Sequence, residues 1–438
     1  MNKNKKKRTK SIEIKSSFTG GALTNFSGIK TFYKFMEKLD LINSLNSLSI
    51  KLHHNAKNDT GTMLSIMILG ILSGMNRISK IENFTLDPLL QQLFGLTEKI
   101  SDSAIIDRLK RFSMKQTSEY MEIIGKTSEK IHKKLGTIKD ILDLDSSVKT
   151  VYGNQQGAEK GFNGQKKGAK SYHPLMAFLG STKECLLSWL RPGNAYTATG
   201  ADEFIKQVFG MLPTGIKSLL IRADSGFFSD KLISVIEEKS GMNYLIKVKL
   251  KNMTSVLIGQ DWQSVPGMPG VEICDFDYRP ASWAKARHFS ALRILKNIEK
   301  DGRLFPTKNW EYFCYCTDIV DSPLQIHRIY GDRGTSENWI ENVKNQMFAG
   351  QLLTNEFWAN EALWLSSIMA YNISVWMRKL SGDISWHQEP ATFRAWFIQL
   401  AGKVMKSGRQ VFLKMYKAYY YKSRWRKIDS AIDNLSFA

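Results

Sequence analysis

The pattern of apolar and polar positions changes along the chain. In residues 30–135 apolar side chains recur every three or four positions, which predicts helices, and residues 60–83 are apolar enough for a buried helix. From about residue 138 the apolar runs become short and continuous, which favours buried strands. We predict strands at 138–148, 171–180, 185–190 and 218–224, with helices at 200–212 and 229–239. This order predicts a mixed α/β sheet in which three antiparallel strands precede a crossover.

The segment after residue 240 has a β-like pattern with Pro and Gly between its apolar stretches. Its predicted strands cover 243–250, 271–278, 289–296 and 310–317. Residues 322–380 and 391–428 are then predicted to be mainly helical. We therefore expect a sheet core made of residues 136–240 and 322–380, a β-rich insertion at 241–321, and helical regions at 1–135 and 381–438.

The composition indicates a polyanionic partner. The 438 residues are 43% hydrophobic and 24% charged, which is typical of a folded chain with several domains. A net charge of +21 is most simply explained by nucleic acid. Residues 1–10 carry six basic side chains and no acid, which predicts an arm that contacts the DNA backbone.

Other classes of protein fit the sequence less well. The longest apolar run, residues 63–75, is about 13 residues long, whereas a membrane span needs roughly 20, so no membrane partner is expected. The N-terminus is charged and does not resemble a signal peptide. The four cysteines lack the spacing of a zinc site, so we expect reduced thiols in a cytosolic protein.

Residues 101–112 are a candidate DNA-reading helix within the N-terminal region. The segment begins with Ser101 and Asp102, which are favoured at helix N-termini, and Arg108 and Arg111 follow on its basic side. A short helix of this kind can be the recognition helix of a helix-turn-helix unit, in which these two arginines would contact DNA. An ordinary amphipathic surface helix has the same pattern, so both interpretations stay open.

Three acidic residues occur in contexts that suit one metal site. Asp145 lies near the end of the strand predicted at 138–148, Asp224 ends the strand predicted at 218–224, and Glu337 falls in a predicted helix. Open α/β sheets place their sites at the carboxyl ends of strands, so these carboxylates can converge there. Carboxylate oxygens suit Mg²⁺, and a pair of such ions clamps the attacking and leaving oxygens of a phosphoryl displacement. On a strongly basic chain, this predicts chemistry on nucleic acid.

The residues around Glu337 carry further polar groups at helical spacing. Tyr330, Arg333, Glu337 and Lys344 are spaced by three, four and seven positions, so they share one face of a helix. Arg333 suits bidentate contact with phosphate, and Lys344 would reach a neighbouring phosphate as a point charge. Arg333 and Glu337 also have the spacing of a surface ion pair, worth about 0.3–0.5 kcal/mol, and this simpler interpretation stays open.

These residues together carry a family resemblance. The spacing of Tyr330, Arg333, Glu337 and Lys344 matches the YREK signature of DDE transposases from bacterial insertion sequences. Residues 143–148 (Asp-Leu-Asp-Ser-Ser-Val) and 223–227 (Ala-Asp-Ser-Gly-Phe) resemble the two aspartate motifs of that family. The resemblance covers roughly residues 60–400 and implies a ribonuclease H-like core interrupted by a β-rich insertion.

The resemblance also implies a function and its partners. It implies cut-and-paste DNA transposition with two divalent ions, Mg²⁺ or in its place Mn²⁺, bound by Asp145, Asp224 and Glu337. Tyr330, Arg333 and Lys344 would contact DNA near the site. The expected partners are double-stranded DNA, as terminal inverted repeats and target, and a second copy of the chain in a homodimer on paired ends. The expected location is the bacterial cytoplasm, at the nucleoid.

Two assignments leave alternatives. Related transposases stack a flipped base on a Trp of the insertion, and Trp283 is the preferred residue because it lies among basic side chains, although packing within a β domain also explains it. Asp143 lies two positions before Asp145, so both share a face of the strand. We prefer Asp145 as the ligand because it lies where the apolar run meets a polar loop.

Two other functions fit parts of the sequence. A nuclease or resolvase of ribonuclease H fold would cleave without strand transfer, and it would need neither the helical N-terminal region nor the β-rich insertion. A DNA-binding regulator would have no use for three carboxylates.

Overall fold

A nine-stranded sheet forms the centre of the computed structural model, which describes residues 14–164, 166–299, 307–351 and 354–437. The predicted basic arm at residues 1–10 lies outside these ranges. The core strands are β2 (Lys139–Ser146), β6 (Leu175–Leu179), β7 (Glu184–Trp189), β8 (Ser218–Ala223) and β9 (Met242–Lys247). They lie in the order β7-β6-β2-β8-β9, with β6 antiparallel to both neighbours and β2, β8 and β9 parallel. This is the ribonuclease H-like topology that the sequence predicted.

Helices cover the core sheet and bury its apolar side chains. The long helices α7 (Met114–Leu135) and α13 (Phe357–Leu380) pack together and against β7, while α8 (Ala201–Met211) and α9 (Asp230–Glu237) are the predicted crossover helices. In α13 nearly every side chain is buried, which explains its almost continuous apolar sequence. Asn372 on α13 bonds the backbone N–H and the carbonyl of Cys185 on β7, both at 2.9 Å, and this fixes the helix to the sheet.

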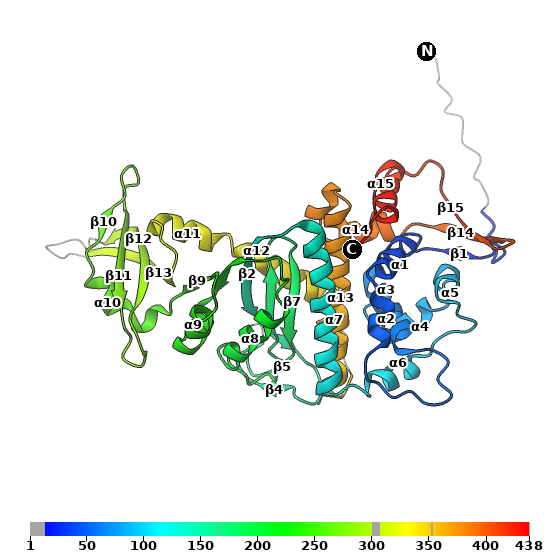
Figure 1. The fold of residues 1–438 in the computed structure, drawn as a ribbon, viewed down its shortest axis with the longest axis horizontal. Helices are drawn as coiled ribbons and strands as arrows, with labels where there is room; N and C mark the ends of the chain where they lie inside the picture. The colour runs from blue at the N-terminus through cyan, green and yellow to red at the C-terminus, as the bar shows by residue number, and fades with distance from the viewer. Residues whose placement is uncertain (1–13, 165, 300–306, 352–353, 438) are drawn as a thin grey trace, which may run out of the picture.

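The insertion is β-rich and extends the core sheet, but it begins after β9. The strand predicted at 243–250 as the first of the insertion at 241–321 is this core strand, because it pairs in parallel with β8. The insertion starts with η2 (Leu250–Asn252) and α10 (Thr254–Ile258). Its strands follow as β10 (Gln263–Ser264), β11 (Val271–Tyr278), β12 (Arg287–Glu299) and β13 (Thr307–Thr317). These strands are antiparallel, and β13 pairs with β9, so the sheet continues from the core into the insertion. Figure 1 shows the insertion at one end of the long axis and the core in the middle.

The N-terminal region is helical, as predicted, and lies beyond the core at the other end (Figure 1). Its helices are α1 (Ile29–Lys38), α2 (Leu41–Asn46), α3 (Thr60–Ser73), α4 (Ile78–Phe84), α5 (Pro88–Phe94) and α6 (Asp102–Leu109). The apolar helix α3 is almost wholly buried among them, starting at an Asp59 cap that accepts from Thr62 N–H at 2.6 Å. No single helix in the described ranges is long and apolar enough to cross a membrane. The helices α3 and α4 reach that length and apolar composition only when taken together, and they are bent by 100° to one another.

The C-terminal region differs from the prediction. Helix was expected over 391–428, but only α14 (Pro390–Phe393), η5 (Arg394–Ile398) and the start of α15 (Lys422–Asp433) are helical. Between them, β14 (Gly402–Ser407) and β15 (Gln410–Met415) form a hairpin whose turn contains Gly408 at φ 58°. The helix prediction was wrong here because a Ser-Gly turn between two alternating segments was overlooked.

The hairpin also joins the two ends of the chain. Strand β1 (Leu23–Thr24) pairs with β14, so a short sheet in the order β1-β14-β15 connects the N- and C-terminal regions. A second small sheet, made of β3 (Lys149–Thr150), β4 (Glu159–Lys160) and β5 (Lys170–Tyr172), follows the core strand β2. The short helix η4 (Ile384–His387) completes the C-terminal region.

Candidate active site

The two aspartates leave the sheet side by side. Leu144 on β2 pairs with Ala223 on the parallel strand β8, so Asp145 and Asp224 are the next residues at the same edge. The three residues before each aspartate are buried, and both aspartates are half-buried. Each carboxylate accepts a local backbone N–H, that of Ser146 for Asp145 at 2.7 Å and that of Gly226, in η1 (Ser225–Phe227), for Asp224 at 2.9 Å. The topology thus places two fixed carboxylates at the carboxyl ends of neighbouring strands.

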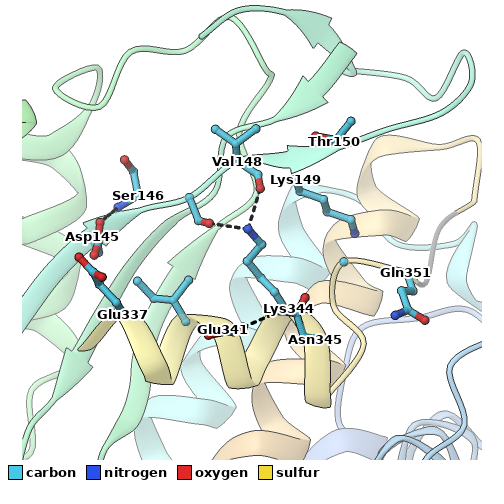
Figure 2. Close-up of a pocket in the computed structure, with 13 residues that line it drawn as sticks. Asp145, Ser146, Val148, Lys149, Thr150, Glu337, Glu341, Lys344, Asn345 and Gln351 are labelled. Carbon is cyan, nitrogen blue, oxygen red and sulfur yellow. Dashed lines mark hydrogen bonds between the residues drawn. The ribbon is translucent and has the colours of Figure 1, made fainter. Parts of the chain in front are cut away.

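Glu337 comes to this edge on a helical segment. The segment consists of α11 (Pro323–Gly331), α12 (Gly334–Glu341) and the π-helical turn η3 (Asn342–Gln346). Trp339 and Val343 are buried on its inner side, with Trp339 against Phe178 of β6 at 5.9 Å between ring centroids. This packing leaves Glu337 exposed toward Asp145, and Figure 2 shows the two carboxylates turned toward one another.

A cavity of about 520 Å³ opens beside Asp145 and Glu337. Its walls come from the loop after β2, from α12 and η3, and from the segment around Gln351. Lys344 and Lys149 line it, as does Glu341, one helical turn beyond Glu337 (Figure 2). The cavity therefore has carboxylates and cationic side chains in its wall. A site that binds a phosphate chain together with its counter-ions needs both.

The electrostatics of Asp145 show how closely the acids face one another. Burial, together with the negative charges of Asp224 and Glu337, raises the pKa of Asp145 to about 6 against the lowering effect of Arg333. Arg333 Nη2 lies 3.0 Å from Asp145 Oδ2, so the guanidinium supplies the positive charge at this point. Within the described ranges, no three His, Cys, Asp or Glu side chains are grouped as a bound metal would need.

Three residues of the signature face inward. Arg333 is buried, and its Nη2 also donates to the Leu144 carbonyl at 2.9 Å. Lys344 Nζ donates to Ser147 Oγ at 2.9 Å and to the Val148 carbonyl at 2.8 Å (Figure 2), and burial lowers the pKa of this lysine. Tyr330 packs on Tyr315 of β13 at 4.9 Å between centroids, and burial raises its pKa to about 12. In this structure Arg333 and Lys344 hold the helical segment against β2 and the loop after it, while Tyr330 packs against β13. The DNA contacts predicted for all three stay a prediction.

Asp143 is separated from the acidic group. It is fully buried, and Arg222 on β8 donates to both of its carboxylate oxygens, at 2.7 and 2.8 Å. Arg222 Nη1 also donates to the Ile329 carbonyl on α11 at 2.7 Å. Asp143 therefore has a charge partner and no opening to the cavity, which supports the preference for Asp145 as the ligand.

The remaining predicted DNA contacts lie away from this site. Arg108 on α6 is buried and donates to Thr60 Oγ1 and the Asn58 carbonyl, both at 3.0 Å, while Arg111 donates to the Lys51 carbonyl at 2.9 Å. Both arginines hold the loop before α3 in place, so α6 does not present Arg108 to a groove in this structure.

Trp283 is buried as well. Its ring is 9% exposed and packs on Phe228 at 4.8 Å between centroids, with the Arg287 guanidinium 4.8 Å from its centre. In this conformation Trp283 packs within the β-rich insertion. Its stacking on a flipped base stays a prediction, and it would require the insertion to open.

Sequence reasoning missed two features of the site. Lys149 is buried in the cavity wall, where burial lowers its pKa to about 7, and its Nζ lies 5.6 Å from the centre of the Trp364 ring. His173 has its Nε2 3.2 Å from Ser146 Oγ, directly after Asp145. Neither residue has a spacing signal, because both reach the site through strand pairing. Lys149 directly follows the strand predicted at 138–148 and His173 lies in the strand predicted at 171–180, so only their place at predicted strands could have drawn attention to them.

Comparison with known proteins identifies the family of this chain. The chain matches the family described as "Transposase DDE domain group 1" over residues 6–437, and it belongs to that family. It is therefore a DNA transposase of the DDE class, whose members cut and join phosphodiester bonds and generally use divalent metals.

A solved structure is also similar to the chain. It is the piggyBac transposase synaptic complex with hairpin DNA, at a TM-score of 0.45 and 12% identity, covering 84% of this chain and 78% of that one. No curated protein matches the sequence.

Proposed function

We propose that Asp145, Asp224 and Glu337 bind two divalent ions, Mg²⁺ or in its place Mn²⁺, and cut and join DNA at the ends of an insertion sequence. One observation carries this proposal. Strand pairing brings Asp145 and Asp224 together at the sheet edge, and Glu337 lines the same cavity as Asp145. All three donors are hard carboxylate oxygens, the type that Mg²⁺ prefers.

The donor set fits a metal with one rearrangement. The pKa of Asp145 is raised by its burial and by the neighbouring acids, so a cation here would relieve both repulsion and desolvation. Arg333 now makes the contact with Asp145 that an ion would make. Binding would therefore displace this guanidinium from Oδ2 and draw Glu337 inward on α12. The Arg333 bond to the Leu144 carbonyl would keep the side chain near the site for contact with phosphate.

The chemistry places distinct demands on these residues. When bound, two ions would stabilise the attacking and leaving oxygens of an in-line displacement. Water oxygen forms a bond to phosphorus while the bond to the 3′-oxygen breaks, and this oxygen leaves as a 3′-hydroxyl. The oxygen of that hydroxyl would then form a bond to a phosphorus in the second strand or in the target, while the bond from this phosphorus to its own 3′-oxygen breaks and that oxygen leaves as a new 3′-hydroxyl. Asp145 and Asp224 would orient the reacting groups, while Lys344 holds the loop that follows Asp145.

The DNA partners would be the terminal inverted repeats and the target, engaged by a homodimer on paired ends. The setting would be the bacterial cytoplasm at the nucleoid. The +21 charge supports a duplex partner, since it favours binding to polyphosphate backbones.

A strand-transfer assay with paired ends and Mg²⁺ tests the proposal. The variants Asp145→Asn, Asp224→Asn and Glu337→Gln should each lose cleavage and joining by more than about 100-fold, because loss of the outer partners of metal ligands already costs about 10–100-fold. Glu122→Gln removes an exposed carboxylate on α7 and should keep full activity. Cleavage without joined products would indicate a nuclease, and near-normal activity of all three variants would refute this assignment.

A further inference from the structure

The β14–β15 hairpin has two unlike faces. Cross-strand partners share a face, and the pairs Val404–Leu413 and Gly402–Met415 turn toward the core, where Val404, Leu413 and Met415 pack. The alternate pairs, Lys403–Lys414 and Met405–Phe412, turn outward. Leu23 of β1 pairs with Lys403 and is 55% exposed, so it extends the outward face.

The hairpin carries positive charge on this outward face and at its tip. Lys403 and Lys414 are on the outward face, Lys406 pairs with Val411 on the other face near the turn, and Arg409 lies in the turn. Residues 402–428 contain nine Lys and Arg and no Asp or Glu. In the described part of the chain Arg424 is paired with Asp383, whereas no ion pair involves Lys403, Lys406, Arg409 or Lys414. Those four side chains are exposed along the strands and at the turn.

Without a bound anion, the unpaired positive charges of the hairpin destabilise its fold. Lys403 lies directly opposite Lys414, and like charges in such a pair destabilise a sheet. Lysines on an edge strand can prevent unwanted pairing, which would explain Lys414 on β15. That role does not explain Lys403 on the central strand β14, nor the basic residues at the turn.

We propose that the β14–β15 hairpin is a DNA-binding ribbon whose outward face contacts the phosphates of double-stranded DNA. A two-stranded ribbon fits the major groove, and Arg409 at its turn and the lysines along its strands would reach phosphates on either side. A second copy of the chain fits this face poorly, because a symmetric contact would bring like charges together. In Figure 1 the hairpin lies at the end opposite the insertion, so it contacts duplex away from the bond that is cut.

Binding to uncut duplex without divalent metal tests this ribbon separately from catalysis. The full-length variant Lys403→Gln/Lys406→Gln/Arg409→Gln/Lys414→Gln is compared with Lys126→Gln/Lys134→Gln/Lys206→Gln/Lys239→Gln, which loses the same charge from exposed positions elsewhere. Fluorescence anisotropy with a labelled duplex of unrelated sequence is measured over a range of salt. Circular dichroism and thermal melting check that both variants fold.

The hairpin variant should lose about 10–100-fold in affinity, and its slope of log K against log salt should become shallower by about 2–4, as expected for lost phosphate contacts. The control variant should change little. Equal losses of DNA affinity in both variants would show that only the net charge of the protein matters, and this would overturn the proposal. It would also be overturned if DNA affinity held while the hairpin variant lost binding to anionic vesicles or changed its oligomeric state.

Discussion

The basic residues beside Asp145 and those of the β14–β15 hairpin have opposite surroundings. Arg222, Arg333 and Lys344 are tied to carboxylates or carbonyls of the core, and the two arginines are fully enclosed. Lys403 and Lys414 are exposed opposite one another. Charge with internal partners fixes geometry, whereas charge without them attracts a polyanion. Chemistry and DNA affinity should therefore be separable by mutation.

The largest expected change in stability follows from breaking the buried ion pair of Asp143 and Arg222. Asp143→Ala leaves Arg222 buried without its carboxylate, and removing one partner of a buried pair costs about 3–5 kcal/mol. Urea unfolding should show this loss, with little change for Glu122→Ala on the surface of α7. Cleavage by the folded fraction should survive, since Asp143 does not open to the cavity. A stable but inactive Asp143→Ala protein would instead make Asp143 the ligand.

Lys344→Met should separate positioning from DNA contact. Without its bonds to Ser147 and Val148, the loop after Asp145 loses support, and cleavage at saturating DNA should fall by about 10–100-fold, as for other residues that orient metal ligands. Affinity for uncut duplex and its salt dependence should stay as in the parent protein. A weaker affinity for DNA with a normal cleavage rate at saturating DNA would show instead that Lys344 contacts DNA phosphate and does not position the loop.

The smallest expected effect is a gain in stability from a change in the hairpin. Lys414→Gln removes one member of the like-charged pair and should stabilise the fold by about 0.2–1 kcal/mol at low salt. The gain should fade at high salt, where exposed charges are screened. Melting of Lys414→Gln at two salt concentrations measures this, with Lys126→Gln as the control. A destabilised Lys414→Gln protein would mean that the lysine has a structural partner.

The sequence predicted those parts that local pattern controls. The apolar residues of β2 and β8 form short runs, so both strands and the acids Asp145 and Asp224 near their ends could be predicted. Spacing showed that Arg333 and Lys344 share a helix face, but not that this face turns toward the sheet, because tertiary packing decides that. Pairing of β13 with β9 is likewise non-local. The hairpin was missed because aromatic and basic residues in its sequence also suit an amphipathic helix.

Divalent-metal binding by the carboxylates is the central claim, and calorimetric titration with Mn²⁺ tests it most directly. The DNA-free parent protein should bind Mn²⁺, and Asp224→Asn should lose this binding while melting at a similar temperature. Equal Mn²⁺ binding by the parent protein and Asp224→Asn would contradict the account.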